Sequence, residues 1–568
     1  MGFMVTPSPP QPGRAAIYFH PEAFTTASDK PMGRNSAGES FLKSFLQFSK
    51  AEKFWVQVTS SDHAKAFESA VRAMNRTEPV QAFGSARLGQ LREPGCLFLP
   101  GPNLSDSAWQ RSFFGHSQWS LCGITHTTAS TNAMDAITGL IAGPIQPWDA
   151  LICTTPTVKN NVELIMQGQV NYLQERLNIQ RLVLPQLPVI PLGIHCKDFT
   201  FTATEKAKAR KQLGIGKDTL VVLFAGRLSF HAKAHPLAMY QALDQAIASS
   251  PKFKNVLLLE LGWHANEPIA KAFSDAAQWA APQLKTLHLD SRDPDLRRMG
   301  WAAGDIFCSL SDNLQEAFGI TPIEAMAAGL PTVVSDWDGY RFTVEDGVTG
   351  YRVPTSMPGS GQGQDLAMRH ALGIDTYDMY SGFTSSLVGI DIDATAEAFR
   401  RLFASAELRK TMGEAGRKRA LERFDWSVVI QEYENLWQSL SDIRKAAANS
   451  SPSVWPARQD PFQIFASYPT TALGPESLLQ ARYENPDHGL ERLGSCLRLA
   501  MVAFAKGVMP SEDELRQLLQ AAGSEAKPAE SLVAALPQDR QLLAYRGLAW
   551  LLKLGFLRLL SRSPSNGR

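Results

Sequence analysis

The sequence predicts two doubly wound, Rossmann-like α/β domains followed by a mainly helical C-terminal extension. Short, wholly apolar runs alternate with helical patterns over residues 15–445, as expected of parallel strands that are covered on both faces. The alternation restarts near residue 200, and the composition changes at residue 446. The chain has 568 residues, 44% of them apolar, which is enough to bury several cores.

The first predicted domain spans residues 15–199 and follows a Pro-rich leader, residues 1–14, that we expect to be disordered. Its helical segments include SFLKSFLQFSK and SDHAKAFESAVRAMNR. Six apolar runs predict its strands: AAIYF (15–19), FWVQV (54–58), GCLFLPG (95–101), LCGITHT (121–127), ALICTT (150–155) and VIPLGI (189–194).

The second predicted domain spans residues 200–445 and ends in a long helix, WSVVIQEYENLWQSLSDIRKA. A polar, Gly-rich stretch at 354–365 predicts a mobile loop within it. Five runs predict its strands: LVVLFAGRL (220–228), VLLLELG (256–262), LKTLHLD (284–290), DIFCSLS (305–311) and TVVSDWD (332–338). Residues 446–470 read as a linker, and the leucine-rich residues 471–568 as a helical extension.

The charge, the cysteines and the apolar runs of the chain limit the classes of function that it can have. The net charge is +1 with 20% charged residues, which argues against nonspecific nucleic-acid binding. The six cysteines are dispersed without a C-x-x-C pair, so free thiols in a reducing compartment are expected. Without an apolar leader or a long uncharged apolar run, the predicted location is the cytoplasm.

The segment EAFGITPIEAMAAGLP begins just past a predicted strand, in a loop that becomes a helix. Glu316 lies at the mouth of that helix and Glu324 within its first turns. Helix N-termini offer unpaired N–H donors and a partial positive charge, and ionised carboxylates accept hydrogen bonds from hydroxyl groups. The pattern therefore fits a polyhydroxy, anionic ligand, although an ordinary capped helix would also produce it.

The segment FAGRLSFHAKAHP follows the first strand of the second domain. Arg227 emerges at the carboxyl end of that strand, the usual ligand edge of an open sheet, and Lys233 follows six residues later. A guanidinium fork and a point cation together neutralise a diphosphate without a metal ion. Solvated surface charges are the alternative for either residue alone.

With its upstream neighbour LRRMGWAAGDIFCSLSDN and its downstream neighbour TVVSDWDGYRFTVEDGVTGYRVP, the first segment resembles the Glu-x7-Glu motif of the family 4 glycosyltransferases. Members of that family are large retaining enzymes of GT-B fold. The resemblance covers about residues 190–440. One departure is Ala234, where the family usually has Gly.

The resemblance implies roles for the matching positions. Glu316 would bind donor-sugar hydroxyls and Glu324 the ribose of the nucleotide. The amides of Phe318, Gly319 and Ile320 would bind the sugar and phosphates, and Arg227 and Lys233 would hold the leaving phosphate. The implied co-substrate is a nucleoside-diphosphate sugar, with no cofactor and no metal ion.

The first domain offers weaker candidates. Gly33 precedes a helix after the first strand, where the family often has a Gly pair, and Arg34 beside it could serve the acceptor. His126 ends the run LCGITHT. By resemblance it would contact the donor sugar, whereas on sequence grounds alone a structural histidine is equally expected. His195 replaces the Asp usual in the family's hinge, and nothing catalytic is inferred from it.

A second acidic motif, Asp336-Trp337-Asp338, has the spacing of a metal-binding D-x-D. That role belongs to a different transferase fold, and a turn with Asp338-Gly339 at its bend is favoured.

The C-terminal run LLAYRGLAWLLKLGFLRLLSR leaves three interpretations open. A small helical domain with a leucine core is favoured. A membrane-surface helix that brings the enzyme to a lipid acceptor at the inner face of the membrane and a winged-helix-like interaction module are the alternatives.

The sequence therefore predicts a retaining hexosyltransferase that acts on a saccharide, lipid or small-molecule hydroxyl. A GT-B epimerase, a phosphorylase and a silent sugar-nucleotide sensor that acts through the C-terminal helices are the alternatives.

Overall fold

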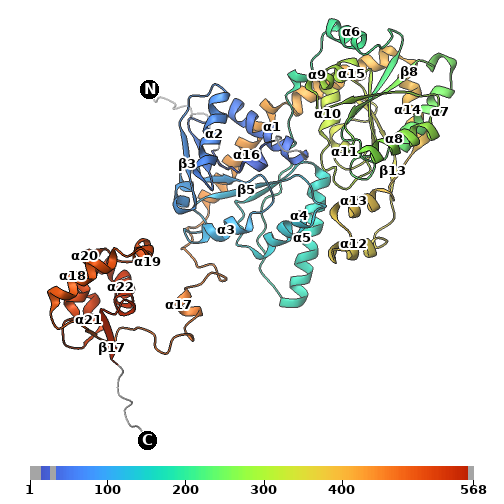
Figure 1. Ribbon diagram of the computed structural model, residues 1–568. Coiled ribbons are helices and arrows are strands. Elements are labelled where there is room, and N and C mark those ends of the chain that lie inside the picture. The colour runs from blue at the N-terminus through green and yellow to red at the C-terminus, as the bar shows by residue number, and fades with distance from the viewer. Residues whose placement is uncertain (1–13, 26–32, 561–568) are drawn as a thin grey trace, which may run out of the picture. The chain divides into compact units, whose positions relative to one another are not determined.

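A computed structural model describes residues 14–25 and 33–560, in two compact units, residues 1–455 and 456–568. Except for Arg14, the predicted leader lies outside the described residues. The first unit contains two α/β lobes, each built around its own parallel sheet (Figure 1).

The described part of the first lobe forms a six-stranded parallel sheet in the order β3-β2-β1-β4-β5-β6. The strands are β1 (Ala16–Tyr18), β2 (Phe54–Gln57), β3 (Val80–Phe83), β4 (Cys96–Phe98), β5 (Ser120–Thr125) and β6 (Ala150–Cys153). The helices are α1 (Gly33–Phe48), α2 (Ser61–Ala73), α3 (Ser105–Ser112), α4 (Thr131–Ala142) and α5 (Pro156–Leu177).

The described part of the second lobe repeats this topology in a sheet of order β12-β11-β10-β7-β8-β9. The strands are β7 (Leu220–Ala225), β8 (Val256–Gly262), β9 (Lys285–Asp290), β10 (Ile306–Ser309), β11 (Thr332–Ser335) and β12 (Gly350–Val353). The helices are α6 (Ala203–Gln212), α7 (Leu237–Ala248), α8 (Glu267–Ala280), α9 (Pro294–Ala303), α10 (Ile320–Ala327), α11 (Tyr340–Thr343), α14 (Ile392–Ala404) and α15 (Ala406–Arg423).

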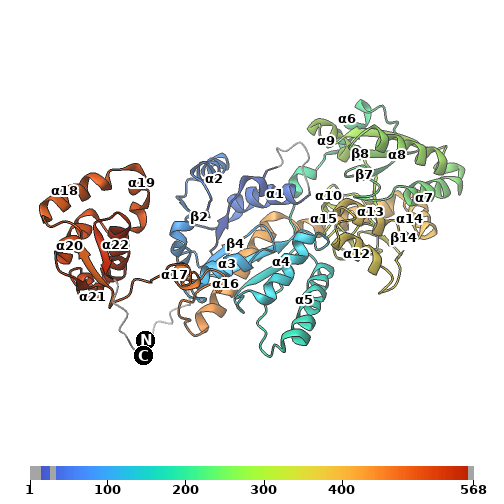
Figure 2. The same cartoon turned by 60° about the horizontal axis from the view of Figure 1, so that its bottom comes forward.

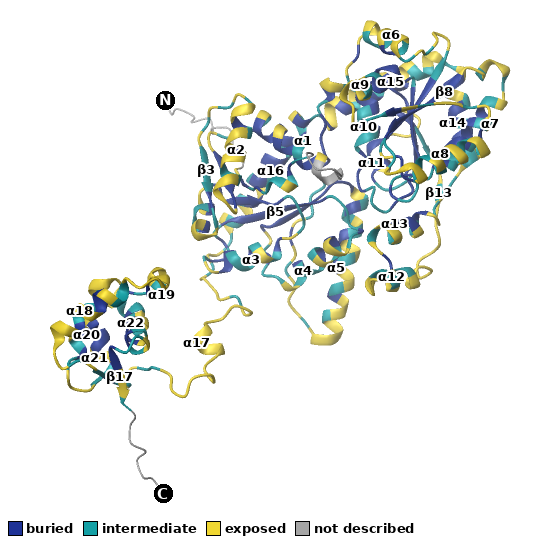
Figure 3. Ribbon diagram, in the orientation of Figure 1, coloured by how far each residue is buried: buried dark blue, intermediate teal, exposed yellow. Residues whose placement is uncertain are grey.

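Both strand orders are those of a doubly wound Rossmann sheet, so the predicted fold class is confirmed. Helices flank both sheets, and the central strands of each lobe are buried (Figure 3), whereas the edge strands β3 and β9 are only partly buried. The predicted run at 189–194 is not a regular strand. It makes isolated bridges at Val189 and Ile194, because Pro191 between them has no N–H to donate.

The long helix α16 (Trp426–Ala446) belongs in sequence to the predicted second domain but packs on the first sheet. Figure 1 shows it, in orange, among the blue elements of the first lobe. Tyr433 and Trp437 on this helix contact Phe98, with ring centroids 5.7 and 6.1 Å away. Ser49 Oγ donates to Glu434 Oε1 at 2.9 Å. The chain therefore crosses between the lobes twice.

The two crossings run side by side. The Ile194 N–H donates to Phe424 O at 2.8 Å, and the Trp426 N–H donates back to Ile194 O at 3.1 Å. A Cβ added to Gly193 would lie 2.4 Å from the ring of Trp426, so this position requires glycine. His195, which replaces the expected Asp, lies 3.2 Å from Ser44 Oγ of α1 through its Nε2.

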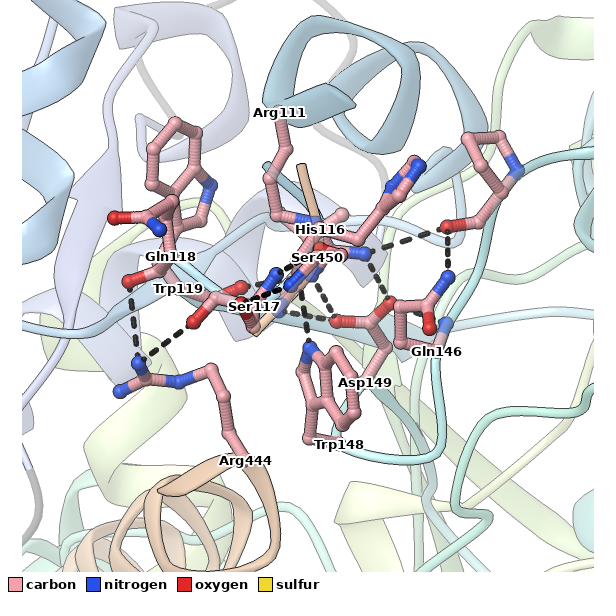
Figure 4. A network of polar contacts seen from close by, with 12 residues as sticks. Arg111, His116, Ser117, Gln118, Trp119, Gln146, Trp148, Asp149, Arg444 and Ser450 are labelled. Carbon is pink, nitrogen blue, oxygen red and sulfur yellow. Dashed lines mark hydrogen bonds and ion pairs between the residues drawn. The ribbon is translucent and has the colours of Figure 1, made fainter. Parts of the chain in front are cut away.

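A buried ion pair fixes the amino-terminal edge of the first sheet (Figure 4). Arg111 and Asp149 are fully buried and joined by two hydrogen bonds of 2.6 and 2.7 Å. The Leu121 N–H donates to Asp149 Oδ1 at 2.8 Å and the Gln146 N–H to Oδ2 at the same distance. Nearby, Arg444 of α16 donates to two carbonyl groups of the same lobe. These contacts lie at the edge opposite to the carboxyl ends of the strands.

The second unit combines helices with a small antiparallel sheet of order β16-β15-β17. Its strands are β15 (Leu478–Ala481), β16 (Lys527–Pro528) and β17 (Leu557–Leu560), and its helices are α17 (Pro461–Ile464), α18 (Pro486–Leu497), α19 (Ala500–Ala503), α20 (Glu512–Ala522), α21 (Ala529–Val533) and α22 (Gln541–Lys553). The favoured interpretation, a small domain with a leucine core, is confirmed. The sheet was not predicted.

The run proposed as a membrane-surface helix is α22, and its apolar side is used inside this domain. Ala544, Leu548 and Leu551 are fully buried. A Cβ added to Gly547 would lie 2.8 Å from Leu518 of α20, so glycine permits the close packing of the two helices. Within the residues that the structure covers, no helix is both long and apolar enough to span a bilayer.

The predicted linker, residues 446–470, is divided between the two units. Trp455 stacks on Trp109 of α3 at 5.8 Å, and the Ser453 N–H donates to Ser112 O at 2.9 Å. The first part of the linker is therefore held against the first lobe. All six cysteines lie within the described residues and none is bonded to another; five are buried and Cys496 is partly exposed.

Candidate functional site

The candidate site lies at the carboxyl edge of the second sheet, where two central strands are neighbours. Strand β10 pairs with β7 in parallel register, Ile306 opposite Val222. Parallel strands end at the same edge, so the loop after β7 and the loop after β10 meet there. These two loops carry Arg227, Lys233 and Glu316.

Three consecutive polar residues after β10 hold the loop after β7 by its main chain. Their contacts are Ser311 Oγ donating to Lys233 O (3.2 Å), the His235 N–H donating to Asp312 Oδ2 (3.2 Å) and Asn313 Nδ2 donating to His231 O (2.8 Å). The same loop is closed by a turn of its own, in which the Lys233 N–H donates to Ser229 O at 3.0 Å. This brace fixes the Cα of Lys233 and the direction of its side chain.

Lys233 and Glu316 form an ion pair at the centre of the site, with 19% and 13% of their side chains exposed. Burial opposes the charge of Lys233, but the Glu316 carboxylate outweighs it and raises the lysine pKa above its ordinary value. Lys233 is therefore held in its cationic form. An ammonium group has three N–H donors, so one partner leaves donors for a second anion.

The N-terminus of α10 is shaped by a glycine. Gly319 has φ +80°, and a Cβ there would lie 2.1 Å from Tyr340 Cε1. Among the described residues, the amides of Phe318, Gly319 and Ile320 have no hydrogen-bond acceptor. The Phe318 side chain points elsewhere, because it is buried in the core next to Phe424. Only the main chain of this segment is therefore offered to a ligand.

Glu324 lies one turn into α10 and is partly buried. Burial raises its pKa to about 7, against the opposing charges of Arg297 and Lys233. Arg227 is exposed and its Nη2 donates to Ala232 O at 3.4 Å, close enough to Lys233 for the two positive charges to interact. The four second-lobe residues singled out in the sequence thus surround one place.

The first lobe contacts this place through the ends of its own strands. Thr155, after β6, donates to Ala317 O at 3.4 Å, and Thr157 donates to Asp338 O at 3.4 Å. Strand β5 is the neighbour of β6, with Thr125 opposite Cys153. His126 follows Thr125 directly and is partly buried. The segment after β6 therefore contacts the loop that leads into α10, and His126 lies at the same carboxyl edge of the first sheet.

Gly33 and Arg34 lie in the first turn of α1. The side chain of Arg34 lies outside the described residues, and its predicted role with the acceptor stays a prediction.

The D-x-D segment forms a turn with structural contacts. Asp336 lies 3.6 Å from Arg341 and 3.5 Å from Arg352. Asp338 has φ +38°, and the Tyr340 N–H donates to Trp337 O at 3.1 Å. In the part of the chain that is described, no group of His, Cys, Asp or Glu side chains is arranged to hold a metal ion.

Sequence reasoning missed two carboxyl groups of this site. Burial raises the pKa of both Asp312 and Asp338 to about 7, and the nearby charge of Glu316 adds to the shift at Asp338. Each has one buried carboxyl oxygen without a hydrogen-bond partner. Asp312 could have been found from its position just past β10, at the ligand edge of the sheet. Asp338 was considered only as a metal ligand of the D-x-D motif or, in preference, as a turn residue.

Two Rossmann-like lobes with a candidate site at their carboxyl edges define the GT-B architecture. Residues 205–360 match a family model described as "Glycosyl transferases group 1". This matched segment contains Arg227, Lys233, Glu316 and Glu324.

Curated relatives match over part of their length. A D-inositol 3-phosphate glycosyltransferase from Geodermatophilus obscurus is 30% identical over 176 residues, which are 29% of this chain and 36% of that protein. A phosphatidyl-myo-inositol mannosyltransferase from Mycobacterium tuberculosis H37Rv is 25% identical over 252 residues, 44% of this chain and 54% of that protein. The chain thus spans only about a third to a half of the length of these relatives.

Two solved structures align with most of this chain. The Anabaena protein HepE, in complex with UDP and glucose, aligns with a TM-score of 0.48 and 15% identity, covering 75% of this chain and 100% of that one. A sucrose-phosphate synthase from Thermosynechococcus elongatus aligns with a TM-score of 0.46 and 17% identity, covering 76% and 99%.

Proposed function

We propose that this chain is a retaining glycosyltransferase that moves a hexose from a nucleoside-diphosphate sugar to a hydroxyl acceptor. One observation carries the proposal. The Arg227 and Lys233 cations and the unbonded amides of the α10 N-terminus meet beside Glu316 and Glu324. The match of residues 205–360 to the group 1 glycosyltransferase model, and relatives named for glycosyl transfer, support it.

The arrangement suits the energetic problem of the reaction. Negative charge grows on the departing phosphate as the sugar becomes oxocarbenium-like. Arg227, Lys233 and the amides of residues 318–320 would already be aimed at that charge before the bond breaks, and preorganised electrostatic stabilisation usually contributes more to catalysis than any other single effect. Glu316 would accept hydrogen bonds from sugar hydroxyls, and Glu324 would bind the ribose.

The first lobe would supply the acceptor side. His126 would contact the donor sugar, and Arg34 with the amide of Gly33 would serve the acceptor hydroxyl. We propose no carboxylate nucleophile. The leaving phosphate itself would take the acceptor proton, which keeps the new bond on the face of the sugar that the phosphate leaves.

Ligand binding is the first test. A ligand that binds only the native state stabilises the protein, by about 2.7 kcal/mol when the ligand concentration is one hundred times Kd, and therefore raises the melting temperature of the protein. UDP, GDP and ADP are each added to the purified chain with EDTA present, followed by their glucose, mannose and N-acetylglucosamine conjugates. At least one nucleoside diphosphate should stabilise the chain without metal. Stabilisation by none would refute the donor site.

Turnover distinguishes the alternatives. With the nucleotide that binds, transfer to hydroxyl acceptors should release the nucleoside diphosphate and persist in EDTA. The product's anomeric proton, followed by NMR, should show the configuration of the donor. Inversion would refute the proposed stereochemistry. Free sugar formed at the same rate without acceptor would favour an epimerase, and binding without turnover a sensor.

A further inference from the structure

The second lobe carries an insertion, residues 357–388, between two short strands. Strands β13 (Thr355–Ser356) and β14 (Gly389–Ile390) pair antiparallel and close its base. It contains α12 (Gln364–Ala371) and α13 (Tyr377–Ser385). Arg369 holds Asp375 with two hydrogen bonds, 2.8 and 2.6 Å, and the Asp375 side chain is fully buried. The insertion is therefore a folded helical element with its own ion pair.

This insertion packs against both lobes. A Cβ added to Gly382 of α13 would lie 3.0 Å from His231 Cβ, so α13 rests on the loop that carries Lys233. His370 of α12 lies 3.0 Å from Thr131 Oγ1, at the start of α4 in the first lobe, through its Nε2. Figures 1 and 2 both show α12 and α13 on the side of the second lobe that faces α4 and α5.

Tyr377 and Ser381 present hydroxyl groups toward the site from α13. Tyr377 Oη lies beside Thr127, the residue after His126, and within electrostatic range of Arg227. Ser381 is fully buried. Tyr377 Oη lies close to the hydroxyl groups of Thr127 and Ser381, but within the described residues neither Tyr377 Oη nor Ser381 Oγ makes a contact with the geometry of a hydrogen bond, although both atoms are shielded from solvent.

A buried hydroxyl group without a well-formed hydrogen bond destabilises the folded protein. Leaving such a group unpaired costs about 1–3 kcal/mol, so both oxygens are expected to gain a partner. The neighbouring Arg227 guanidinium favours an anionic partner, and hydroxyl groups donate well to a charged oxygen.

We propose that Tyr377 and Ser381 bind an oxygen of the donor diphosphate opposite Arg227, so that the insertion forms one wall of the donor site. This inference rests on the proposed function and deepens it. It assigns the insertion a role in recognising the second phosphate, because Arg227 and the two hydroxyls approach the ligand from different elements.

The test compares diphosphate with monophosphate binding, measured by isothermal titration on the full chain. Tyr377→Phe removes one hydroxyl and keeps the ring. It should weaken UDP, GDP or ADP binding, whichever the wild-type chain binds, by about tenfold, the size of one hydrogen bond to a charged group. Binding of the matching monophosphate should not change, since it lacks the second phosphate. Ser381→Ala should act in the same direction.

Tyr380→Phe is the matched control, because Tyr380 also lies on α13 but stacks on His370 at 4.5 Å. It should bind like the wild type. Equal weakening of mono- and diphosphate by Tyr377→Phe would show a structural role and overturn the inference, as would unchanged diphosphate binding. A wild-type chain that binds none of the diphosphates refutes the donor site itself, and the role of Tyr377 with it.

Discussion

Variants of the ion pair between Lys233 and Glu316 can show whether Lys233 has a catalytic or only a structural role. Lys233→Met keeps most of the apolar stem of the side chain and removes the ammonium group. If that group stabilises the leaving phosphate, kcat/KM should fall about 10²–10³-fold, the loss measured when one preorganised electrostatic donor is removed elsewhere. The value of kcat/KM is measured from the rate at which the nucleoside diphosphate is released from the preferred donor.

The same change should destabilise the fold, because Glu316 keeps its charge with only 13% of its side chain exposed. Breaking a fully buried pair costs about 3–5 kcal/mol and an exposed pair about 0.2–1 kcal/mol. A pair exposed by 19% and 13% should lie between, at about 1–3 kcal/mol. Urea denaturation followed by tryptophan fluorescence measures this loss.

Adding Glu316→Gln to Lys233→Met removes the unpaired charge. Stability should then recover, whereas activity should not, since the phosphate still lacks its cation. Lys271→Met is the control, because Lys271 pairs with Asp275 at 74% and 60% exposure and should change neither quantity. If the double variant regained activity along with stability, the pair would be structural and the assignment of Lys233 wrong.

Three further changes test other parts of the description. Burial raises the pKa of Glu324 from 4.5 to about 7, so the folded state loses stability as the pH rises from 4.5 to 7, and the loss is constant above pH 7. Glu324→Gln should therefore raise the melting temperature more at pH 8 than at pH 5. Equal increases at the two pH values would contradict this. Gly319→Ala should lower stability by more than the about 1–2 kcal/mol of a left-handed backbone, because its Cβ would meet Tyr340, while Gly373→Ala, at φ +69° with open space, should lose only the backbone part. Arg111→Met should cost about 3–5 kcal/mol in urea denaturation by stranding its buried carboxylate partner, and a loss below about 1 kcal/mol would show that Asp149 finds other partners.

The strands that apolar runs predicted are mostly those with a neighbour on each side. Within the two six-stranded sheets, the two strands that were missed, β3 and β12, both lie at sheet edges. Their sequences, VQAF and GYRV, include polar residues that central strands avoid. A sheet edge accepts such residues because one side of the strand is not covered. The run at 189–194 was predicted as a strand but is not one, because Pro191 lacks the N–H that a paired strand needs, whatever the apolar content of the run.

The candidate site was predictable where its residues lie close together in the sequence. Glu316 and Glu324 share one segment, and Arg227 and Lys233 share another. The contacts that join the two segments were not predictable. Ser311, Asp312 and Asn313 bind main-chain groups of the facing loop, and every residue has such groups, so the sequence of that loop does not reveal the contact.

Tyr377 was unpredictable for a similar reason. It lies in an insertion whose first part was interpreted as a mobile loop, and its neighbours Thr127 and Arg227 are distant in sequence. The same holds for Arg111 and Asp149, which meet at the amino-terminal edge of the first sheet. In each case only the fold defines the pair.

The acidic groups around Lys233 raise a question that geometry alone does not answer. A site for a diphosphate should not be crowded with carboxylates, yet Asp312, Glu324 and Asp338 lie near it. Burial raises the pKa of each of the three to about 7. Near neutral pH a substantial part of each is therefore uncharged, and the field of the cations and of the α10 N-terminus is not cancelled. Glu316, paired directly with Lys233, is the carboxylate whose charge the site balances. On this argument the acidic residues supply acceptors for hydroxyl groups while the positive potential that a diphosphate needs is preserved.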